Sequence, residues 1–180
     1  MSFLKRFTSA LVYLFINYIL AYIPAWWIRK LLYRLFGMKI GRRSRINMKC
    51  TVISPWNIRI GDNTAVNEFV TLDGRGGLRI GNNCSISIYS ILFTASHHIN
   101  SDSFEYYKKT TSIGDGVWIG ARAVIMAGTI IKKGVVIGAN STTSGNVVYE
   151  ENGVYVGVPA EFKFFRTSKD VSIKVQAFFR

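Results

Sequence analysis

Residues 113–137 read IGDGVWIGARAVIMAGTIIKKGVVI, and isoleucine recurs there at every sixth position from Ile113 to Ile137. A period of six matches neither a helix nor a single strand. It is typical of a parallel β-helix that places a short strand on each of three sides. The same spacing begins at Ile40 and ends at Thr143. The sequence therefore predicts an all-β solenoid.

Three hexapeptides make one coil, and the phase of the repeat predicts about five coils, over residues 40–57, 60–77, 80–97, 113–130 and 131–148. In most hexapeptides a small residue follows the bulky aliphatic residue four positions later, and we expect both side chains to face a narrow interior. The longest interruption is a loop at residues 98–112, directly after His97. Long loops in compact domains are usually functional.

The repeat divides the chain into three parts. We expect residues 1–39 to form an apolar and basic helical segment, residues 40–148 the β-helix, and residues 149–180 a short C-terminal extension. Cys50 and Cys84 both occupy the small inward position, where we expect reduced core residues. The sequence holds no disulfide framework and no paired zinc motif, which suits a cytoplasmic protein.

Residues 7–28 carry no charged side chain. Basic residues flank this run on both sides, at Lys5, Arg6, Arg29, Lys30 and Arg34. Three interpretations stay open: an apolar helix that caps the first coil, a helix that lies in the membrane interface, or a membrane span. Asn17, Pro24 and the scattered aromatic residues weaken the third interpretation. A cap and an interfacial anchor are compatible with each other.

The charge of the chain is strongly positive, with a formal net charge of +13 and no acidic residue before Asp62. Such a charge attracts phosphate, whether in anionic lipid headgroups, a phosphorylated acceptor or a polyanionic cofactor. Nucleic acid is a poor candidate. The basic residues flank an apolar segment and do not form a groove with stacking aromatic residues.

Three motifs together resemble the hexapeptide-repeat acyltransferases: residues 94–97 (TASH), 113–121 (IGDGVWIGA) and 157–160 (GVPA). The most similar branch is that of the sugar and capsular polysaccharide O-acetyltransferases, which includes maltose and galactoside acetyltransferases. The resemblance covers about residues 31–166. It implies a left-handed β-helix, a homotrimer with three active sites between subunits, and acetyl-CoA as the acyl donor. Periodicity alone does not give the hand.

The resemblance places the general base at His97, with His98 as the rival base and as a candidate for substrate binding. An imidazole ionises near neutral pH, so it can accept the proton of a hydroxyl that attacks the thioester carbonyl directly. His98 stands where capsular members commonly carry an acidic residue, which leaves open what orients the base. Either histidine could instead be an ordinary residue of a surface loop.

Further site residues follow from the same resemblance. Asn67 falls at a position for acceptor binding, although it could equally be a corner residue that hydrogen-bonds the backbone. Trp118 is expected to point outward and to wall the thioester pocket, or to pack at a trimer interface. The contacts implied for CoA are backbone groups at Ala121 and Ala139 and the basic side chains of Lys163 and Arg166.

The sequence thus predicts an acetyl-CoA-dependent O-acetyltransferase for a sugar hydroxyl in capsule, O-antigen or exopolysaccharide synthesis. The basic, apolar N-terminus suggests a lipid-linked oligosaccharide as the acceptor, at the inner face of the cytoplasmic membrane. An N-acetyltransferase of an amino sugar and a non-catalytic β-helix scaffold stay open. No metal is expected, because a γ-type carbonic anhydrase on this repeat needs three histidine ligands and the chain has two histidines.

Overall fold

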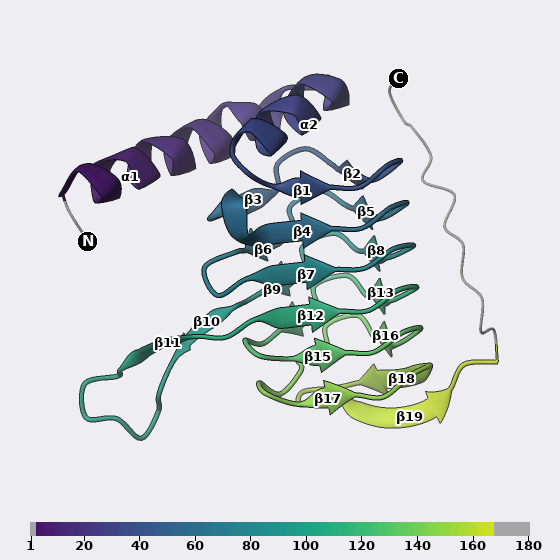
Figure 1. The fold of residues 1–180 in the computed structure, drawn as a ribbon. Coiled ribbons are helices and arrows are strands. Elements are labelled where there is room, and N and C mark those ends of the chain that lie inside the picture. Colours follow the sequence, from purple (N-terminus) through teal and green to yellow (C-terminus); the bar gives the residue numbers. More distant parts are fainter. Residues whose placement is uncertain (1–2, 168–180) are drawn as a thin grey trace.

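The computed structural model describes residues 3–167, with side chains from Phe7 onward. The side chains of Lys5 and Arg6, and residues 168–180 of the predicted C-terminal extension, lie outside this part. Helices precede a prism of stacked strands, and an arm projects from one side of the prism (Figure 1). The helical elements are α1 (Phe3–Tyr18), the 3-10 helix η1 (Leu20–Tyr22), α2 (Trp26–Leu35) and the 3-10 helix η2 (Pro55–Asn57).

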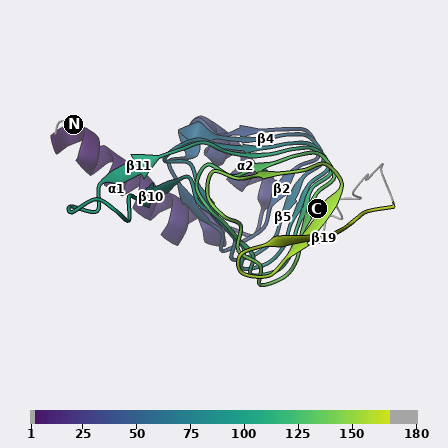
Figure 2. The same cartoon turned by 90° about the horizontal axis from the view of Figure 1, so that it is seen from below.

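Three sheets form the sides of a triangular prism (Figure 2). Sheet A contains β1 (Lys39–Ile40), β4 (Ile58–Ile60), β7 (Leu78–Ile80), β12 (Thr111–Ile113), β15 (Ile130–Ile131) and β17 (Val148–Tyr149). Sheet B contains β2 (Arg45–Ile46), β5 (Ala65–Val66), β8 (Ser85–Ile86), β13 (Trp118–Ile119), β16 (Val136–Ile137), β18 (Gly153–Val156) and the antiparallel β19 (Glu161–Phe165). Sheet C contains β3 (Thr51–Ile53), β6 (Thr71–Asp73), β9 (Ile91–Leu92) and β14 (Val124–Ile125).

The chain visits sheets A, B and C in turn and winds counter-clockwise as it recedes from the N-terminal end, so the prism is left-handed (Figures 1 and 2). We name its corners by the sheets they join. Corner AB starts with residues 41–44, corner BC with residues 47–50 and corner CA with residues 54–57, and each recurs in every coil. Ile60 pairs with Ile80, and Ile113 with Ile131, which confirms the phase of the repeat.

The prediction of about five coils is one coil short, because sheet A has six strands. β17 and β18 add the sixth coil to sheets A and B. In it Tyr149 pairs with Ile131 and Tyr155 pairs with Ile137, so two buried tyrosines occupy the aliphatic positions. Their rings meet edge to face at 4.8 Å and close the end of the core. A repeat pattern that admits only aliphatic residues does not detect these two tyrosines.

The small inward residues also satisfy the backbone at the corners. Ser44 Oγ donates to the carbonyl of Gly61 at 2.5 Å, and Thr64 Oγ1 donates to the carbonyl of Gly81 at 2.8 Å. The Cys84 thiol continues this ladder to the carbonyl of Gly114 at 3.0 Å. Burial raises the pKa of Cys84 to about 11 and that of Cys50 to about 12, so both thiols stay protonated at neutral pH. Both are free and buried, as expected for core residues.

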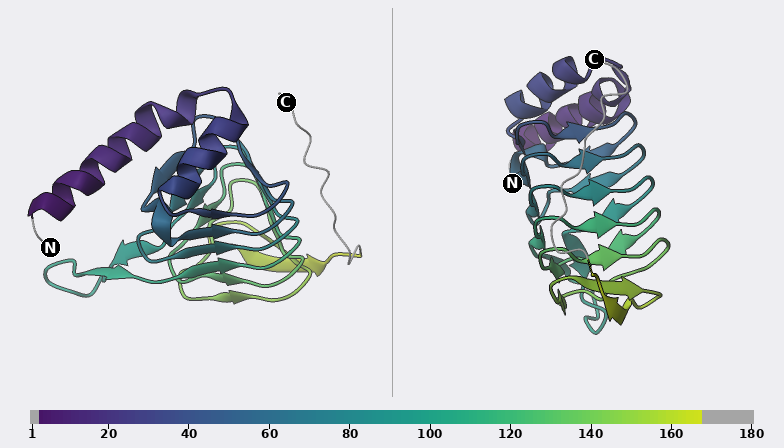
Figure 3. Two further views of the ribbon diagram at one scale, coloured as in Figure 1. Left: turned by 45° about the horizontal axis from the view of Figure 1, so that its top comes forward. Right: turned by 90° about the vertical axis from the view of Figure 1, so that its right-hand side faces the viewer.

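The uncharged N-terminal run covers most of α1, all of η1 and the first turn of α2, and α1 and α2 lie across the first coil (Figure 3). The turn between them contains Pro24, which cannot continue a helix. Ile16, Leu20 and Tyr33 are fully buried in the same core cluster as the strand isoleucines. The helices therefore cap the prism, as the first interpretation predicted. None of the helices within the described residues has the length and apolar character needed to cross a bilayer.

Polar side chains of this cap pair with the open edge of the first coil. Asn17 acts as a substitute strand: its side-chain oxygen accepts from the Val52 N–H at 2.7 Å, and its Nδ2 donates to the Val52 carbonyl at 3.0 Å. Arg29 donates to the carbonyl of Ile46 at 2.7 Å, and Lys30 to that of Gly41 at 2.9 Å. The two hydrogen bonds of Asn17 with Val52 explain why a polar residue occurs within the apolar run.

Replacing Asn17 with leucine is expected to lower the free energy of unfolding by about 2–4 kcal/mol, because it leaves a buried N–H and a buried carbonyl of Val52 unpaired. Urea denaturation followed by circular dichroism measures the change. Asn100→Leu, at an exposed position in the arm, is the matched control and should be close to neutral. An equal loss in both variants would show that Asn17 does not cap the edge.

Candidate active site

The arm is a hairpin of β10 (Ala95–His97) and β11 (Tyr106–Lys108), which leaves the prism at corner CA. It carries both histidines of the chain. The register pairs His97 with Tyr106 and Ala95 with Lys108. Because side chains alternate across a strand, His97, Tyr106 and Lys108 lie on one face of the arm.

His97 is exposed, and its Nδ1 lies 2.5 Å from the carbonyl oxygen of Phe104. A carbonyl only accepts, so Nδ1 carries the proton in the neutral ring, and Nε2 keeps its lone pair. Phe104 has a φ of 49°, in the left-handed region, at the turn that returns the chain to β11. The Phe104 carbonyl therefore orients the His97 ring, which the sequence could not explain.

His98 points to the other face of the arm. Its ring lies 4.6 Å from that of Tyr107, measured between centroids, whereas the His97 ring lies 5.4 Å from that of Tyr106. The two adjacent histidines therefore face different surroundings. Of the two, only His97 shares a face of the arm with Lys108.

A fixed ion pair lies at corner CA, at the base of the arm. The buried Asp73 carboxylate accepts from Arg75 Nε at 2.9 Å and from Arg75 Nη2 at 3.0 Å. Burial alone would raise the pKa of Asp73, but hydrogen bonds from the Arg75 side chain and from the N–H groups of Thr94 and Arg75 lower it. The guanidinium carbon lies 5.9 Å from the Tyr106 ring centroid, and Lys108 Nζ lies 5.8 Å from it. This cluster could not be predicted from the sequence, because the spacing of Asp73, Arg75 and Tyr106 carries no signal.

Four other predicted site residues gather along corner BC or beside it. Trp118, on β13 of sheet B, is 52% exposed, and its Nε1 donates to Ser87 Oγ at 3.0 Å. Ala121 and Ala139 follow at corner BC in successive coils, and Ala139 is exposed. The outward indole offers an apolar wall beside the exposed Ala139.

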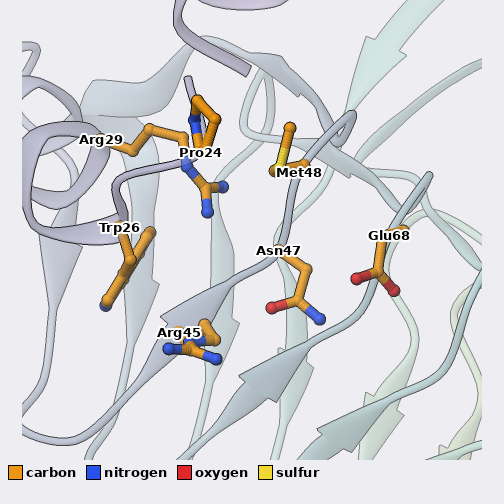
Figure 4. Close-up of a pocket in the computed structure, with 7 residues that line it drawn as sticks. All are labelled: Pro24, Trp26, Arg29, Arg45, Asn47, Met48 and Glu68. Carbon is orange, nitrogen blue, oxygen red and sulfur yellow. The ribbon is translucent and has the colours of Figure 1, made fainter. Parts of the chain in front are cut away.

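Asn67 lies at the same corner but has structural partners. Its Nδ2 donates to the Ile86 carbonyl at 3.1 Å, and its oxygen lies 3.4 Å from Asn47 Nδ2. A neighbouring pocket of about 90 Å³ is lined by Asn47, Glu68 and Arg29, among others (Figure 4). Arg29 is buried there, and burial lowers its pKa. The hydrogen bonds of Asn67 match the corner role that the sequence left open beside acceptor binding.

Lys163 and Arg166 lie elsewhere. Lys163 Nζ is 3.9 Å from a carboxylate oxygen of Glu161 on β19. Arg166 donates to the carbonyl of Gly134 at 3.0 Å and reaches that of Gly116 at 3.5 Å, both at corner AB. Lys163 is exposed beside Glu161, whereas Arg166 is engaged with the backbone.

The structure does not bring His97 together with Trp118, Ala121 and Ala139 within one chain. His97 stands on the arm at corner CA, and the other three belong to corner BC, at the opposite edge of sheet C (Figure 2). A single prism therefore holds the predicted site residues in two separate groups, which we call half-sites.

Comparison with known proteins agrees with this architecture. Residues 110–145 match the family described as bacterial transferase hexapeptide (six repeats). WcaF of Escherichia coli (strain K12), named as a colanic acid biosynthesis acetyltransferase, is 33% identical over 132 residues, which cover 71% of this chain and 72% of that protein. The chain belongs to the hexapeptide-repeat acetyltransferase family.

Two further relatives of this hexapeptide-repeat acetyltransferase are informative. WbbJ of Escherichia coli (strain K12), named as a lipopolysaccharide biosynthesis O-acetyl transferase, is 40% identical over 67 residues, a match that spans 37% of this chain and only 33% of WbbJ. A hexapeptide-repeat acetyltransferase from Vibrio cholerae, solved in complex with acetyl coenzyme A, superposes with a TM-score of 0.76 at 27% identity. That alignment covers 89% of this chain and 86% of the other.

Proposed function

We propose that this protein transfers the acetyl group of acetyl-CoA to a hydroxyl of a surface-polysaccharide sugar, with His97 as the general base. The observation that carries the proposal is the contact of His97 Nδ1 with the Phe104 carbonyl, which leaves Nε2 as a proton acceptor on an exposed arm. The named relatives in colanic acid and lipopolysaccharide synthesis supply the substrate class.

The reaction needs no covalent enzyme intermediate. His97 Nε2 takes the proton of the acceptor hydroxyl as its oxygen attacks the thioester carbonyl carbon. The tetrahedral intermediate collapses with cleavage of the carbon–sulfur bond, and the imidazolium returns the proton to the CoA sulfur. A backbone N–H in the groove is the expected donor to the oxyanion.

A homotrimer completes this site. His97 of one protomer would face Trp118, Ala121 and Ala139 of the next, so that the two half-sites enclose one CoA. The separation of these residues within one chain supports the proposal, because a ring of head-to-tail contacts joins unlike surfaces. Lys163 is then a candidate for the CoA phosphates, with Arg166 as its neighbour.

We further propose that the enzyme works at the inner face of the cytoplasmic membrane on a lipid-linked oligosaccharide. The helical cap carries large exposed apolar side chains, which we call the outer apolar face: Phe7, Leu11, Leu14, Tyr18, Trp27, Leu31 and Leu35. Their helical spacing aligns them along α1 and α2. Together with the net charge of +13, this face suits the interface of an anionic bilayer.

The triple variant Leu11→Ser, Leu14→Ser, Tyr18→Ser is expected to lose most of its binding to phosphatidylglycerol vesicles in a flotation assay. The variant lacks three exposed apolar side chains, so less apolar surface is removed from water when the protein binds the vesicle. Phe164→Ser is the matched control, since Phe164 is equally exposed but lies on β19 at the far end of the prism. Equal binding by all three proteins would exclude this face as the anchor.

The assignment of the activity itself is tested by CoA release. The purified protein should release CoA from acetyl-CoA only when surface oligosaccharide is added, and mass spectrometry should find the acetyl group on a sugar oxygen. Acetyl on a sugar nitrogen would favour the amino-sugar alternative. Absence of transfer would favour a scaffold.

A further inference from the structure

A cleft of about 380 Å³ lies between α1 and corner CA, where the arm leaves the prism. Val12 and Tyr13 of α1 line it together with Trp56 of corner CA. Arg75 and Lys108 line it as well, and Lys108 belongs to the arm itself. A volume of this size suits a small ligand or part of a larger one.

The cleft combines apolar surface with positive charge. Tyr13 is 39% exposed and Trp56 48% exposed, and Tyr13 lies on the same helix as the outer apolar face. Asp73 holds Arg75 through Nε and Nη2 and so fixes the guanidinium at the edge of the cleft. Within residues 7–167, no carboxylate forms an ion pair with Lys108. The side chains of Arg75 and Lys108 carry two positive charges against the single negative charge of Asp73, so the net charge at the cleft is positive.

The cleft is also connected to His97. Arg75 and Lys108 each lie within 6 Å of the Tyr106 ring centroid, at 5.9 and 5.8 Å. The same ring lies 5.4 Å from that of His97 on the shared face of the arm. A ligand held by the cations would therefore reach the base over the face of Tyr106, a flat apolar surface of the kind on which sugar rings pack.

We propose that this cleft binds a phosphate carried on a long apolar chain, and that it holds the acceptor by its lipid end. The apolar chain lies along α1 toward the outer apolar face, the phosphate meets Arg75 and Lys108, and the sugar extends past Tyr106 to His97. Arginine and lysine both form strong charge-assisted hydrogen bonds to phosphate oxygens. The inference rests on the proposed function, since it names how that site recognises its acceptor.

Farnesyl phosphate, used below its micellar concentration, is a suitable probe of the full-length protein. We expect saturable binding that changes tryptophan fluorescence, with the change lost in Trp56→Phe. Lys108→Gln should weaken the affinity about five- to tenfold, the effect of losing one charge-assisted contact to phosphate. Lys108 is exposed, so this variant should fold normally. Lys133→Gln, exposed at corner AB, is the matched control and should keep the affinity of the wild type.

Two further ligands separate the contributions to binding. Farnesol lacks the phosphate and inorganic phosphate lacks the chain, so each should bind at least about tenfold more weakly than farnesyl phosphate. Dihexanoyl phosphatidylglycerol tests the other source of a lipid phosphate. Displacement of farnesyl phosphate by an equal concentration of this lipid would assign the cleft to bulk membrane lipid and overturn the proposal.

Acetyl-CoA binding, measured on the same samples, separates this inference from the proposed function. If acetyl-CoA binds but farnesyl phosphate does not, or if Lys108→Gln binds it as well as the wild type does, the cleft is not the lipid-phosphate site. If farnesyl phosphate binds but no acetyl-CoA binds, the proposed function fails. If Trp56 emission depends on protein concentration without ligand, a second copy of the chain covers the cleft, and the proposal is wrong.

Discussion

His97→Ala is expected to lower kcat for acetyl transfer by about 10²–10⁴-fold, the usual contribution of a positioned general base. The loss arises because no other group on this face of the arm can accept a proton at neutral pH: Tyr106 is a phenol, and Arg75 and Lys108 are cations. The measurement is CoA release from acetyl-CoA with surface oligosaccharide as acceptor. The affinity for acetyl-CoA should not change, because its contacts are expected at corner BC.

His98→Ala is the control for this variant, since it removes the same ring from the adjacent position on the opposite face. We expect it to change kcat by no more than a few-fold, and we expect both variants to melt at the wild-type temperature because both rings are exposed. A large loss in His98→Ala with little effect in His97→Ala would move the base to the other face of the arm.

Two inactive variants are expected to restore activity when they assemble together. His97→Ala removes the base at corner CA, and Ala139→Trp fills the groove expected to hold CoA at corner BC. In a trimer each site takes His97 from one protomer and Ala139 from the next. Random assembly of equal amounts leaves both groups intact in about one quarter of the sites. Co-expressed, differently tagged chains should therefore regain about a quarter of wild-type CoA release.

The same mixture gives a different result if one chain supplies the whole site. Each site would then carry one defect or the other, and the mixture would be no more active than the two variants alone. Lys133→Trp, which adds the same bulk at the exposed corner AB, controls for unspecific effects of a tryptophan and should be fully active. Activity of the mixture near zero would rule out the shared site.

Much of the architecture could be predicted from the sequence. The six-residue spacing from Ile40 onward determined the sheets and their register, because one phase buries all the aliphatic residues at the repeat positions. It failed at Tyr149 and Tyr155, where no further coil follows the last one and larger rings can close the core. It also could not choose among the roles of residues 7–28, since a cap and a membrane span have similar apolar composition.

The candidate site was predictable only in part. The motif TASH located His97, but the carbonyl that fixes its ring belongs to Phe104, and a backbone group leaves no trace in the residue types. The Asp73–Arg75 pair and Tyr106 come from different coils and meet only because corner CA stacks them. Trp118 and Ala139 were predicted to join His97 in a site between subunits, and within one chain folding places them at another corner.

The sequence by itself determined the prism, the position of the long loop and the choice of His97 as the candidate base, because periodic burial and a local motif are properties of neighbouring residues. The tertiary structure alone decided which lone pair of His97 is free, which cations share its face and which residues it cannot reach within one chain. These depend on distances between side chains far apart in the sequence, and only the stacking of coils sets such distances.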